Sequence, residues 1–337
     1  MTTTPMKKEP IAMNKLHLRR AATLLALLLL LCACLPACGG ATQSHKNNGC
    51  LTVVCTNYAA FDLAREIVGG GAIPDTTSVQ VIMLGRPGQD MHSYEPTAAD
   101  IIEIGGADIL VCVGTESWLD AAVKASGNKD LIRVAMTEVC DTLPEPLVEE
   151  GHDHDHDHAD GSVCVSESDE HVWLSLKNAR RIADAITDAA CEAVPAESAL
   201  WKGQSNALQV KLMELEREYA LMMQSAVRDT ILIADRHPFG YLAYELGLTC
   251  YAAFPGCSSE TSASFATQTA LIEKTKELDL PYIYVMEGSN TSIAKAIVDA
   301  TGAEILTLQS LQVVTDYETS YLAVMRDNLE ALRKGLS

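Results

Sequence analysis

Short runs of apolar residues, rich in β-branched side chains, alternate along the chain with longer amphipathic stretches. Runs of this length between helical segments are typical of parallel strands that are buried on both faces of a sheet. We predict eight strands, four in each half of the chain, at residues 51–55, 79–84, 108–113, 132–136, 230–234, 249–253, 282–286 and 304–308. The pattern therefore predicts an α/β protein with two lobes, each a parallel four-stranded sheet with flanking helices.

The segment between the two sets of strands has the periodicity of one long helix. Leu208, Leu212, Leu215, Tyr219 and Met222 recur at steps of three and four residues, with charged residues on the other faces. This spacing predicts a single amphipathic helix from about residue 197 to residue 226 that joins the two lobes. A core helix of one large domain is the alternative.

The N-terminal region has the composition of an export signal. Basic residues precede the apolar run Ala21–Cys34, which is too short to cross a bilayer comfortably and has the form of a secretory signal core. Small residues just before Cys38 resemble the lipobox of bacterial lipoproteins, in which the cysteine becomes the lipidated first residue. We expect Cys38 to anchor the protein to the membrane; an ordinary cleaved signal peptide or a short membrane anchor is the alternative.

These features predict the organisation of the whole chain. We expect a signal peptide over 1–37, a lipid anchor and tether over 38–50, an N-terminal α/β lobe over 51–195, a linker helix over 196–227 and a C-terminal α/β lobe over 228–337. Such a protein is extracytoplasmic and anchored to the cell membrane by its lipid, either at the cell surface or in a periplasm.

The charge balance excludes one class of partner. The chain has 45 acidic and 25 basic residues, for a formal net charge of −20. An acidic surface repels nucleic-acid phosphates and attracts cations, so we expect no nucleic-acid partner. Eight of the eleven cysteines remain after the signal peptide and anchor. Cys250 and Cys257 are close enough in sequence for a disulfide, but spacing does not decide pairing and buried free thiols are equally compatible.

Outside the N-terminal region and the segment 149–161, the chain has three histidines: His92, His171 and His237. His92 and His237 follow predicted strands, one in each half of the chain, and open parallel sheets bind their ligands beyond the carboxyl ends of strands. His171 directly precedes a predicted helix. Three imidazoles in one interlobe cleft suit zinc, which takes nitrogen ligands at about 2.0–2.1 Å with water or a carboxylate in the fourth position. Taken singly, each histidine could instead be a hydrogen-bonded turn or helix residue.

Three segments resemble the ligand motifs of a known protein family. They are HSYEPT at 92–97, DEHVWL at 169–174 and HPFGYL at 237–242. Their sequences and order are similar to those of the metal-binding lipoproteins that supply zinc and manganese ABC importers, and the likeness covers essentially the whole mature chain. The resemblance implies that the three motif histidines bind the metal ion, that a rigid linker helix allows only a small tilt of the lobes, and that the partner is an ABC permease.

The chain departs from this family near two of its ligands. Glu170 stands where the family usually has proline before its second histidine. Many members also offer a carboxylate as the fourth ligand in a Leu-Asp-x-Leu turn, where this chain has Gln309. We expect water in the fourth position, ahead of Glu287, Asp90 or Gln309. Glu287 could instead act as a hinge or helix-capping residue.

The resemblance also indicates which metal is bound. Zinc-binding members typically have an imidazole as the third ligand, as His237 provides here, whereas the manganese branch has a carboxylate. The segment 149–161 is of low complexity, and its histidines alternate with aspartates, at His152, His154, His156 and His158. Zinc-binding members often have such an insertion, so we expect it to be a mobile loop that captures metal near the cleft. A solubilising acidic loop is the alternative.

The sequence therefore predicts a monomeric zinc-binding component of an ABC importer, which captures Zn²⁺ outside the cytoplasm and delivers it to the membrane permease. We expect no enzymatic activity. The alternatives are a manganese- or iron-binding lipoprotein or adhesin of the same fold, and a zinc hydrolase. The hydrolase is disfavoured because the chain has no HExxH motif, no nucleophile elbow and no obvious general base beside the ligands.

Overall fold

The N-terminal sheet is built around β1 (Leu51–Cys55), which is buried along its whole length. In the computed structural model of the protein, β1 pairs in parallel with β3 (Val79–Met83) and with β4 (Ile109–Cys112). The outer strand β5 (Ile132–Ala135) continues the parallel sheet, and the two-residue β2 (Asp75–Thr76) adds an antiparallel edge beside β3. The strand order is β2-β3-β1-β4-β5. The chain continues from β1 to β3 on one side and then crosses to β4 on the other side of β1, so the strand order reverses there. Such a switch point is where open α/β sheets bind ligands.

The structure describes residues 50–71, 75–76, 78–145, 168–258, 263–313 and 316–337. All of them belong to one compact unit that covers 44–337. Within these ranges, no helix has both the length and the apolar composition that a membrane span requires. The predicted signal peptide, Cys38 and the histidine-rich segment 149–161 lie outside the described residues.

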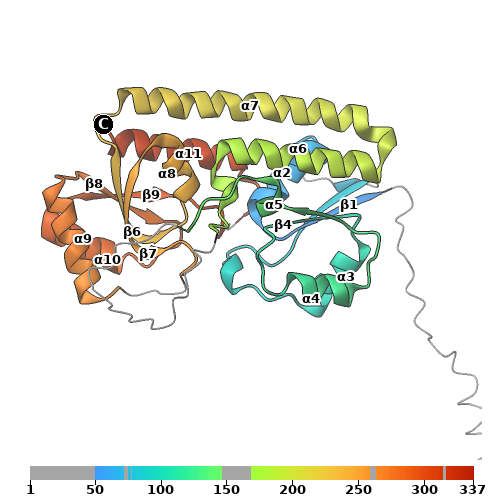
Figure 1. Ribbon diagram of the computed structural model, residues 1–337, viewed down its shortest axis with the longest axis horizontal. Coiled ribbons are helices and arrows are strands. Elements are labelled where there is room, and N and C mark those ends of the chain that lie inside the picture. The colour runs from blue at the N-terminus through green and yellow to red at the C-terminus, as the bar shows by residue number, and fades with distance from the viewer. Residues whose placement is uncertain (1–49, 72–74, 77, 146–167, 259–262, 314–315) are drawn as a thin grey trace, which may run out of the picture. The chain divides into compact units, whose positions relative to one another are not determined.

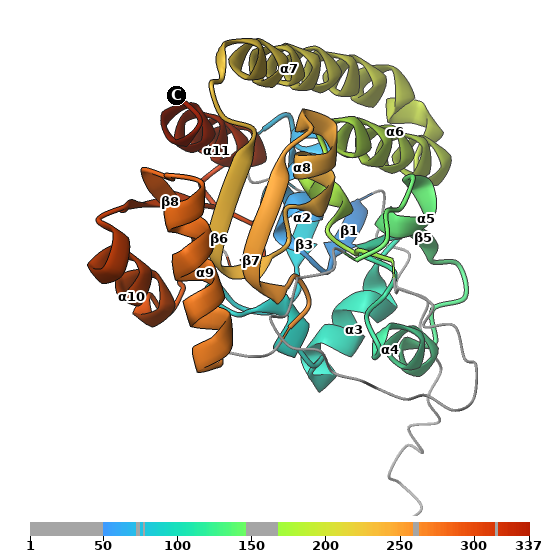
Figure 2. The same cartoon turned by 60° about the vertical axis from the view of Figure 1, so that its left-hand side comes forward.

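The C-terminal sheet has four parallel strands. They are β6 (Thr230–His237), β7 (Thr249–Pro255), β8 (Tyr282–Met286) and β9 (Glu304–Leu308), in the order β7-β6-β8-β9. Figure 2 shows β6 beside β7. Strand β6 continues three residues past its predicted end, and its pairing with β7 shifts register between Ile233 and Arg236. His237 is therefore the last residue of the strand, and the prediction that it follows the strand end at residue 234 was wrong.

One long helix runs beside both lobes. Helix α7 (Ser198–Ser225) follows the short 3-10 turn η3 (Pro195–Glu197) and lies along one side of the molecule in Figure 1. It packs against α6 (Leu176–Ala193) and α2 (Tyr58–Val68) at one end and against α11 (Tyr321–Gly335) at the other. Its buried residues include all five apolar positions that predicted the helix. The two parallel sheets and the long helix between them confirm the predicted fold class.

The remaining helices cover the opposite faces of the two sheets (Figures 1 and 2). Helices α3 (Ala98–Gly106) and α4 (Leu119–Ser126) pack on the N-terminal sheet, where Leu110 and Leu119 share one apolar cluster. Helices α9 (Phe265–Glu277) and α10 (Ser292–Thr301) do the same on the C-terminal sheet. The short helices α5 (Met136–Val139) and α8 (Gly240–Leu246) are the exception, because Met136 and Tyr241 belong to the apolar cluster that contains Leu212 of α7. Both sheets are thus covered on two faces, which explains why their strands are continuous apolar runs.

A single apolar cluster connects the two lobes beneath α7. It includes Val53 and Ile109 from the N-terminal sheet, Ile231 and Tyr284 from the C-terminal sheet, and Leu212 from α7. Because these side chains share one core, the elements that hold the site residues are packed together as one body.

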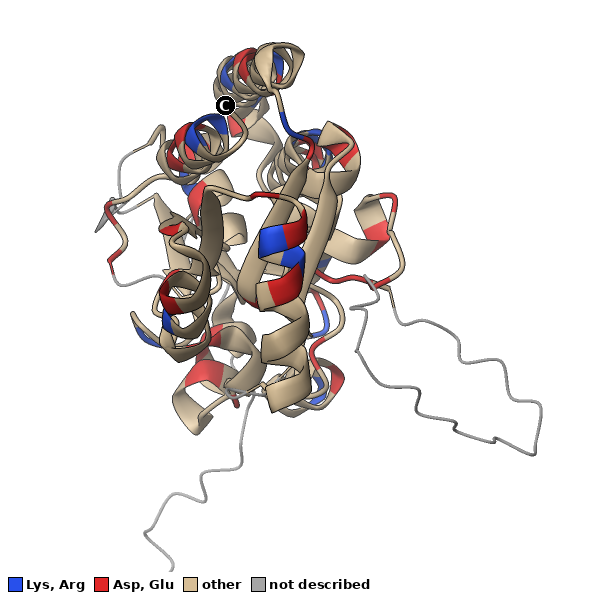
Figure 3. Cartoon of the chain, turned by 90° about the vertical axis from the view of Figure 1, so that its left-hand side faces the viewer, with Lys and Arg blue, Asp and Glu red and all other residues tan. Residues whose placement is uncertain are grey.

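Charged residues of both signs are interspersed along the helices in the view of Figure 3. Several form exposed ion pairs, such as Lys334 Nζ with Glu304 at 3.4 Å. Pairs of this kind contribute only about 0–1 kcal/mol each, so the fold rests on its apolar cores.

Candidate metal centre

His92 lies in a 3-10 turn, η1 (Met91–Ser93), between β3 and α3. The Asp90 carboxylate caps this turn by accepting a hydrogen bond from the His92 N–H at 3.0 Å. The other oxygen of Asp90 forms an ion pair with Arg236 Nη2 at 2.9 Å. The turn that holds His92 in the N-terminal lobe is therefore tied to β6 in the C-terminal lobe.

His171 is oriented by the residue two positions before it. Asp169 Oδ1 accepts hydrogen bonds from the His171 backbone N–H at 2.9 Å and lies 2.7 Å from the ring Nδ1. Both side chains are fully buried, and the Tyr241 hydroxyl holds the Asp169 carbonyl at 2.7 Å. With Nδ1–H donating to the carboxylate, Nε2 carries the lone pair of the neutral ring. Among the described residues, this Nε2 has no hydrogen-bond partner.

The segment around His171 differs from the predicted one. We expected His171 to lead directly into a helix, but it precedes only the three-residue turn η2 (Val172–Leu174), and α6 starts at Leu176. The Trp173 indole in this turn donates to the Ser310 carbonyl at 2.9 Å. The turn η2 thus connects the segment that contains His171 to the C-terminal lobe before α6 begins.

His237, at the carboxyl end of β6, is 5% exposed. Burial lowers the pKa of its imidazole to about 4; the charge of Asp169 raises it and that of His171 lowers it further. The ring is therefore neutral at physiological pH, the state in which imidazole binds metal. Its Nδ1 has no hydrogen-bond partner within the described part of the chain.

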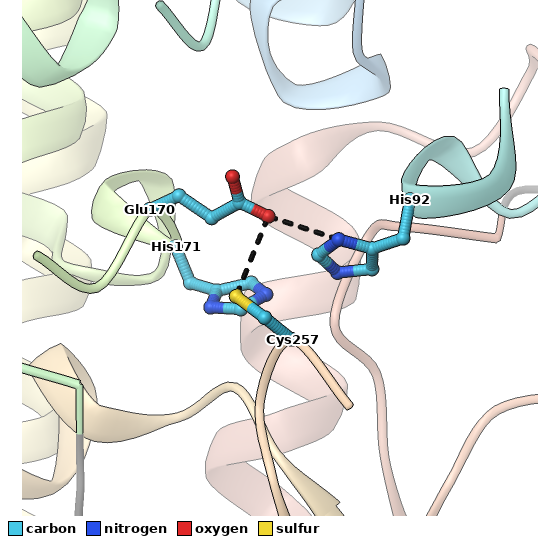
Figure 4. A group of neighbouring side chains, drawn as sticks. All are labelled: His92, Glu170, His171 and Cys257. Atoms are coloured by element: carbon cyan, nitrogen blue, oxygen red, sulfur yellow. Dashed lines mark hydrogen bonds and ion pairs between the residues drawn. The ribbon is translucent and has the colours of Figure 1, made fainter. Parts of the chain in front are cut away.

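The structure brings two of the three histidines close together with two residues that the sequence analysis had not selected as ligands. The rings of His92 and His171 have centroids 5.5 Å apart. One ligand atom each from His92, Glu170, His171 and Cys257 lies within 4.8 Å of the others, as Figure 4 shows. A second group of this kind contains Glu145, Asp169 and His171. Neither group contains His237, although its pKa responds to the charges of His171 and Asp169.

Gly256 shows how tightly His237 and His171 are packed around the end of β7. A Cβ atom added at Gly256 would lie 2.9 Å from His171 Cε1 and 3.0 Å from the His237 carbonyl oxygen. It would also lie 3.2 Å from Glu145 Oε1. Only a residue without a side chain lets the strand end pass between these groups.

Glu170 connects several residues of the site. Its Oε1 lies 2.9 Å from His92 Nδ1, and its Oε2 accepts a hydrogen bond from the Thr115 hydroxyl. Burial alone would raise the pKa of Glu170, but the hydrogen bonds from His92 and Thr115 outweigh it and lower the pKa to about 2. Glu170 is therefore a carboxylate at any physiological pH. In the sequence, a glutamate at position 170, where the family that the chain resembles usually has proline, was the signal that could have identified this residue.

Cys257 follows β7 and faces two carboxylates. Its Sγ lies 3.6 Å from Glu170 Oε1 and 3.8 Å from Glu145 Oε2. Burial and the neighbouring charges of Glu170 and Glu145 raise the pKa of the thiol. Both Cys250 and Cys257 are free, so the structure contains no disulfide between them.

A cavity of about 730 Å³ opens at this point between the ends of the two sheets. Its wall includes Thr56 and Asn57 directly after β1, and Pro255 at the end of β7. His92, Glu170 and Cys257 also line it, together with Glu145, Trp173 and Gln312. A cation that entered this cavity would meet carboxylate, imidazole and thiol groups on one wall.

The three side chains expected as alternatives to water in the fourth position are engaged elsewhere. Asp90 pairs with Arg236, and Glu287 accepts hydrogen bonds from the Ser310 N–H and hydroxyl at 2.8 and 2.7 Å. The Gln309 backbone is held by Asn328 of α11, and its side chain lies near Asp327. Pairing with α11 thus turns Gln309 away from the histidines.

Gln312, three residues further on, contacts the site in place of Gln309. It is 4% exposed, and its amide Nε2 lies 2.9 Å from His92 Nε2. Since His92 Nδ1 faces the Glu170 carboxylate, Nε2 can accept this hydrogen bond. Gln312 could not be selected from the sequence, because the turn after β9 extends further than its Leu-x-x-Leu pattern indicated.

The chain is similar to known proteins over most of its length. Residues 53–335 match the family described as "ZnuA: Zinc-uptake complex component A periplasmic". The zinc-binding lipoprotein AdcA of Streptococcus pneumoniae R6 is 29% identical over 316 residues, which cover 91% of this chain and 60% of that protein. The high-affinity zinc uptake system protein ZnuA of Bacillus subtilis is 28% identical over 309 residues, covering 89% of this chain and 93% of that protein.

Solved structures share the fold. The metal-dependent lipoprotein YcdH of Bacillus subtilis has a TM-score of 0.68 at 26% identity and covers 85% of this chain and 99% of that one. The Zn(II)-bound ZnuA-like domain of Streptococcus pneumoniae AdcA has a TM-score of 0.68 at 25% identity and covers 86% and 99%. The chain thus spans about 60% of the AdcA protein and nearly all of its ZnuA-like domain.

Proposed function

Because the chain belongs to the family of the periplasmic component A of zinc-uptake complexes, we propose that it binds Zn²⁺ outside the cytoplasm and delivers it to an ABC permease. It acts as a carrier and not as an enzyme, with His92, His171 and His237 as the metal ligands. The relatives of similar sequence are named for zinc binding and zinc uptake, which supports this choice of metal.

The proposal rests on the contacts that orient the ring nitrogens of the histidines for metal binding. His92 and His171 each present Nδ1 to a neighbouring carboxylate, Glu170 and Asp169. Carboxylates in this position fix the tautomer of a ligand histidine and make its other nitrogen more basic. His237 is neutral because it is buried. A set of imidazole ligands favours Zn²⁺ over manganese, which prefers more oxygen ligands.

The anchor and the histidine-rich segment are part of the same proposal. We propose that the protein is exported, that Cys38 is lipidated, and that the protein acts as a monomer at the outer side of the membrane. His152, His154, His156 and His158 then supply a second, weaker metal-capturing site. The name of the AdcA lipoprotein supports the anchor.

The test is to purify residues 39–337, to measure metal content and stoichiometry, and to repeat both after deleting 150–161. One tightly bound zinc that survives the deletion is expected, because none of the three proposed histidine ligands belongs to the segment. A protein that regains no transition metal after chelator treatment contradicts the proposal. Turnover of ester, peptide or phosphate substrates by the zinc-loaded protein would favour a hydrolase instead.

The choice of metal is tested at the third ligand. Replacing His237→Glu adds a carboxylate and should shift the ratio of zinc to manganese affinity by about tenfold toward manganese. The control His237→Gln removes the imidazole without adding charge and should weaken zinc binding without this gain for manganese. Competition titrations with a metal-responsive chelator measure both. An unchanged preference in His237→Glu counts against His237 as a ligand.

A further inference from the structure

Cys257 differs from the other cysteines of the described chain in its surroundings. Of the seven free cysteines in the described ranges, it is the one that is exposed, and it lies on the wall of the interlobe cavity. Its Sγ belongs to the group of ligand atoms within 4.8 Å that includes His92, Glu170 and His171 (Figure 4). Its position therefore places a sulfur where a cation held by the two histidines would lie.

His171 provides independent evidence that this point binds a ligand. Its side chain is fully buried, and its Nδ1 is occupied by Asp169, so Nε2 is the nitrogen left with a lone pair. A buried nitrogen without a hydrogen-bond partner is costly unless it has another function. Figure 4 shows this imidazole beside the Cys257 sulfur.

The charges around Cys257 also favour a cation. Glu170 and Glu145 place carboxylate oxygens 3.6 and 3.8 Å from Sγ, and Asp169 lies behind His171. The Cys257 N–H also donates to Glu145 Oε1 at 3.3 Å, which holds the residue in this orientation. These carboxyl groups gather negative charge around the sulfur, and a divalent cation bound there would compensate it.

We propose that Cys257 binds the transported metal through its sulfur, together with His92 and His171, and so takes the coordination position that would otherwise be filled by water. The inference rests on the proposed function. When the sulfur binds, the thiol gives up its proton to the solvent and the metal–sulfur bond forms. Glu170 remains the positioning residue that holds His92 through Nδ1. The Gln312 amide, which donates to His92 Nε2, moves aside when the metal binds that nitrogen.

A thiolate changes which metals the site prefers. Sulfur is a soft ligand that favours zinc over the harder manganese ion, whereas carboxylate and water favour manganese. The chain thus replaces the carboxylate of many relatives with a ligand that strengthens the preference for zinc. Because its pKa is raised, Cys257 should react with alkylating reagents only at alkaline pH, where part of the exposed thiol is ionised; a bound metal should then protect it.

Cobalt(II) reports this bond directly, because a thiolate ligand gives cobalt a charge-transfer absorption in the near ultraviolet. We expect the purified, chelator-treated protein to bind one cobalt ion with this band. Cys257→Ser should bind cobalt without the band and should bind zinc about tenfold more weakly or worse. The matched control Cys250→Ser changes a partly buried thiol of the same strand region and should leave band and affinity unchanged.

Alkylation with iodoacetamide at alkaline pH, followed by mass spectrometry of the Cys257 peptide, provides a second readout. Zinc should protect this thiol in the unmodified sequence, and the His171→Ala variant should lose the protection. Cobalt binding without the band, or equal alkylation with and without zinc, overturns the role of Cys257 while leaving the proposed function intact. Failure of the unaltered protein to bind any transition metal overturns the proposed function instead.

Discussion

At the scale of single residues, consecutive carboxylates act on two different histidines. Asp169 bonds Nδ1 of His171 at 2.7 Å, and Glu170 lies 2.9 Å from Nδ1 of His92, which is about eighty positions earlier in the chain. Neighbouring residues in an extended segment point to opposite sides, so one dipeptide can reach both rings. The segment before η2 therefore orients two candidate ligands at once.

Gly256 is the residue at which the packing of the site can be tested. In Gly256→Ala, the new methyl group would lie 3.0 Å from the His237 carbonyl oxygen, a backbone atom that cannot move aside easily. We expect the strand end and His171 to shift, and zinc affinity to fall by about tenfold or more. A competition titration against a fluorescent zinc chelator measures this change.

Gly203→Ala is the control for that substitution. Gly203 lies in α7, and an added Cβ would meet no atom within 4 Å. Its replacement should leave zinc affinity unchanged and stabilise the helix by up to about 1 kcal/mol. If Gly256→Ala binds zinc as tightly as the unaltered protein, the close packing around Gly256 does not determine the geometry of the site.

At the scale of elements, α3 depends on its N-terminal cap. The Thr97 hydroxyl accepts a hydrogen bond from the Asp100 N–H, and Asp100 Oδ2 accepts one from the Thr97 N–H at 2.7 Å. The helix has only nine residues, and Ile104 is its one buried residue in the described structure. Since short helices gain little from propensity, the capping box contributes much of the local stability. This helix follows the turn that holds His92.

The cap gives a pH-dependent prediction. Burial, the largest single influence, raises the pKa of Asp100, but the hydrogen bonds from Thr97 and Tyr94 and the charge of Arg86 together outweigh it and lower the pKa below its ordinary value. The carboxylate therefore stabilises the fold above about pH 4, and this contribution is lost as the pH falls through the lower pKa of the folded state. Asp100→Asn should reduce the free energy of unfolding by about 0.5–1 kcal/mol at pH 7.

Urea unfolding at several pH values checks this expectation. The difference between Asp100→Asn and the unaltered protein should narrow as the pH decreases below about 4. Glu103→Gln, an exposed change in the same helix, is the control and should have little effect at any pH. A constant difference down to low pH would mean that the charge of Asp100 is not what stabilises the cap.

At the scale of the whole molecule, α7 makes the two lobes share a core. Leu212 and Leu215 are fully buried in the cluster that also contains residues of both sheets. Leu212→Ala should therefore lower the free energy of unfolding by about 2–5 kcal/mol, through lost apolar contacts and the remaining cavity. The lobes should still unfold in one transition, measured by urea titration with fluorescence and circular dichroism.

Leu221→Ala is the matched control on the same helix. Leu221 is 48% exposed, so its truncation should cost less than about 0.5 kcal/mol. Two separate unfolding transitions in Leu212→Ala would contradict the shared core and would indicate that each lobe folds independently.

The residue pattern was sufficient to predict the eight parallel strands and the long helix and to select the three candidate histidines, but not the two-residue edge strand β2. These features are local: burial on both faces produces continuous apolar runs, and a helix repeats its apolar face every three to four residues. The match of α7 to its five predicted positions illustrates this. The predicted ends of elements were less accurate, because the register shift in β6 depends on its neighbour β7.

Only the tertiary structure decided which side chains surround the histidines. Gln312 contacts His92 across 220 positions of sequence, and Cys257 meets Glu170 across 87. Gln309 is turned away because Asn328 of α11 holds its backbone. Contacts of this kind leave no periodic signal, since they arise where the ends of two separate sheets meet. Short segments of the sequence determine which strands and helices form, whereas the packing of distant segments determines which side chains line the site.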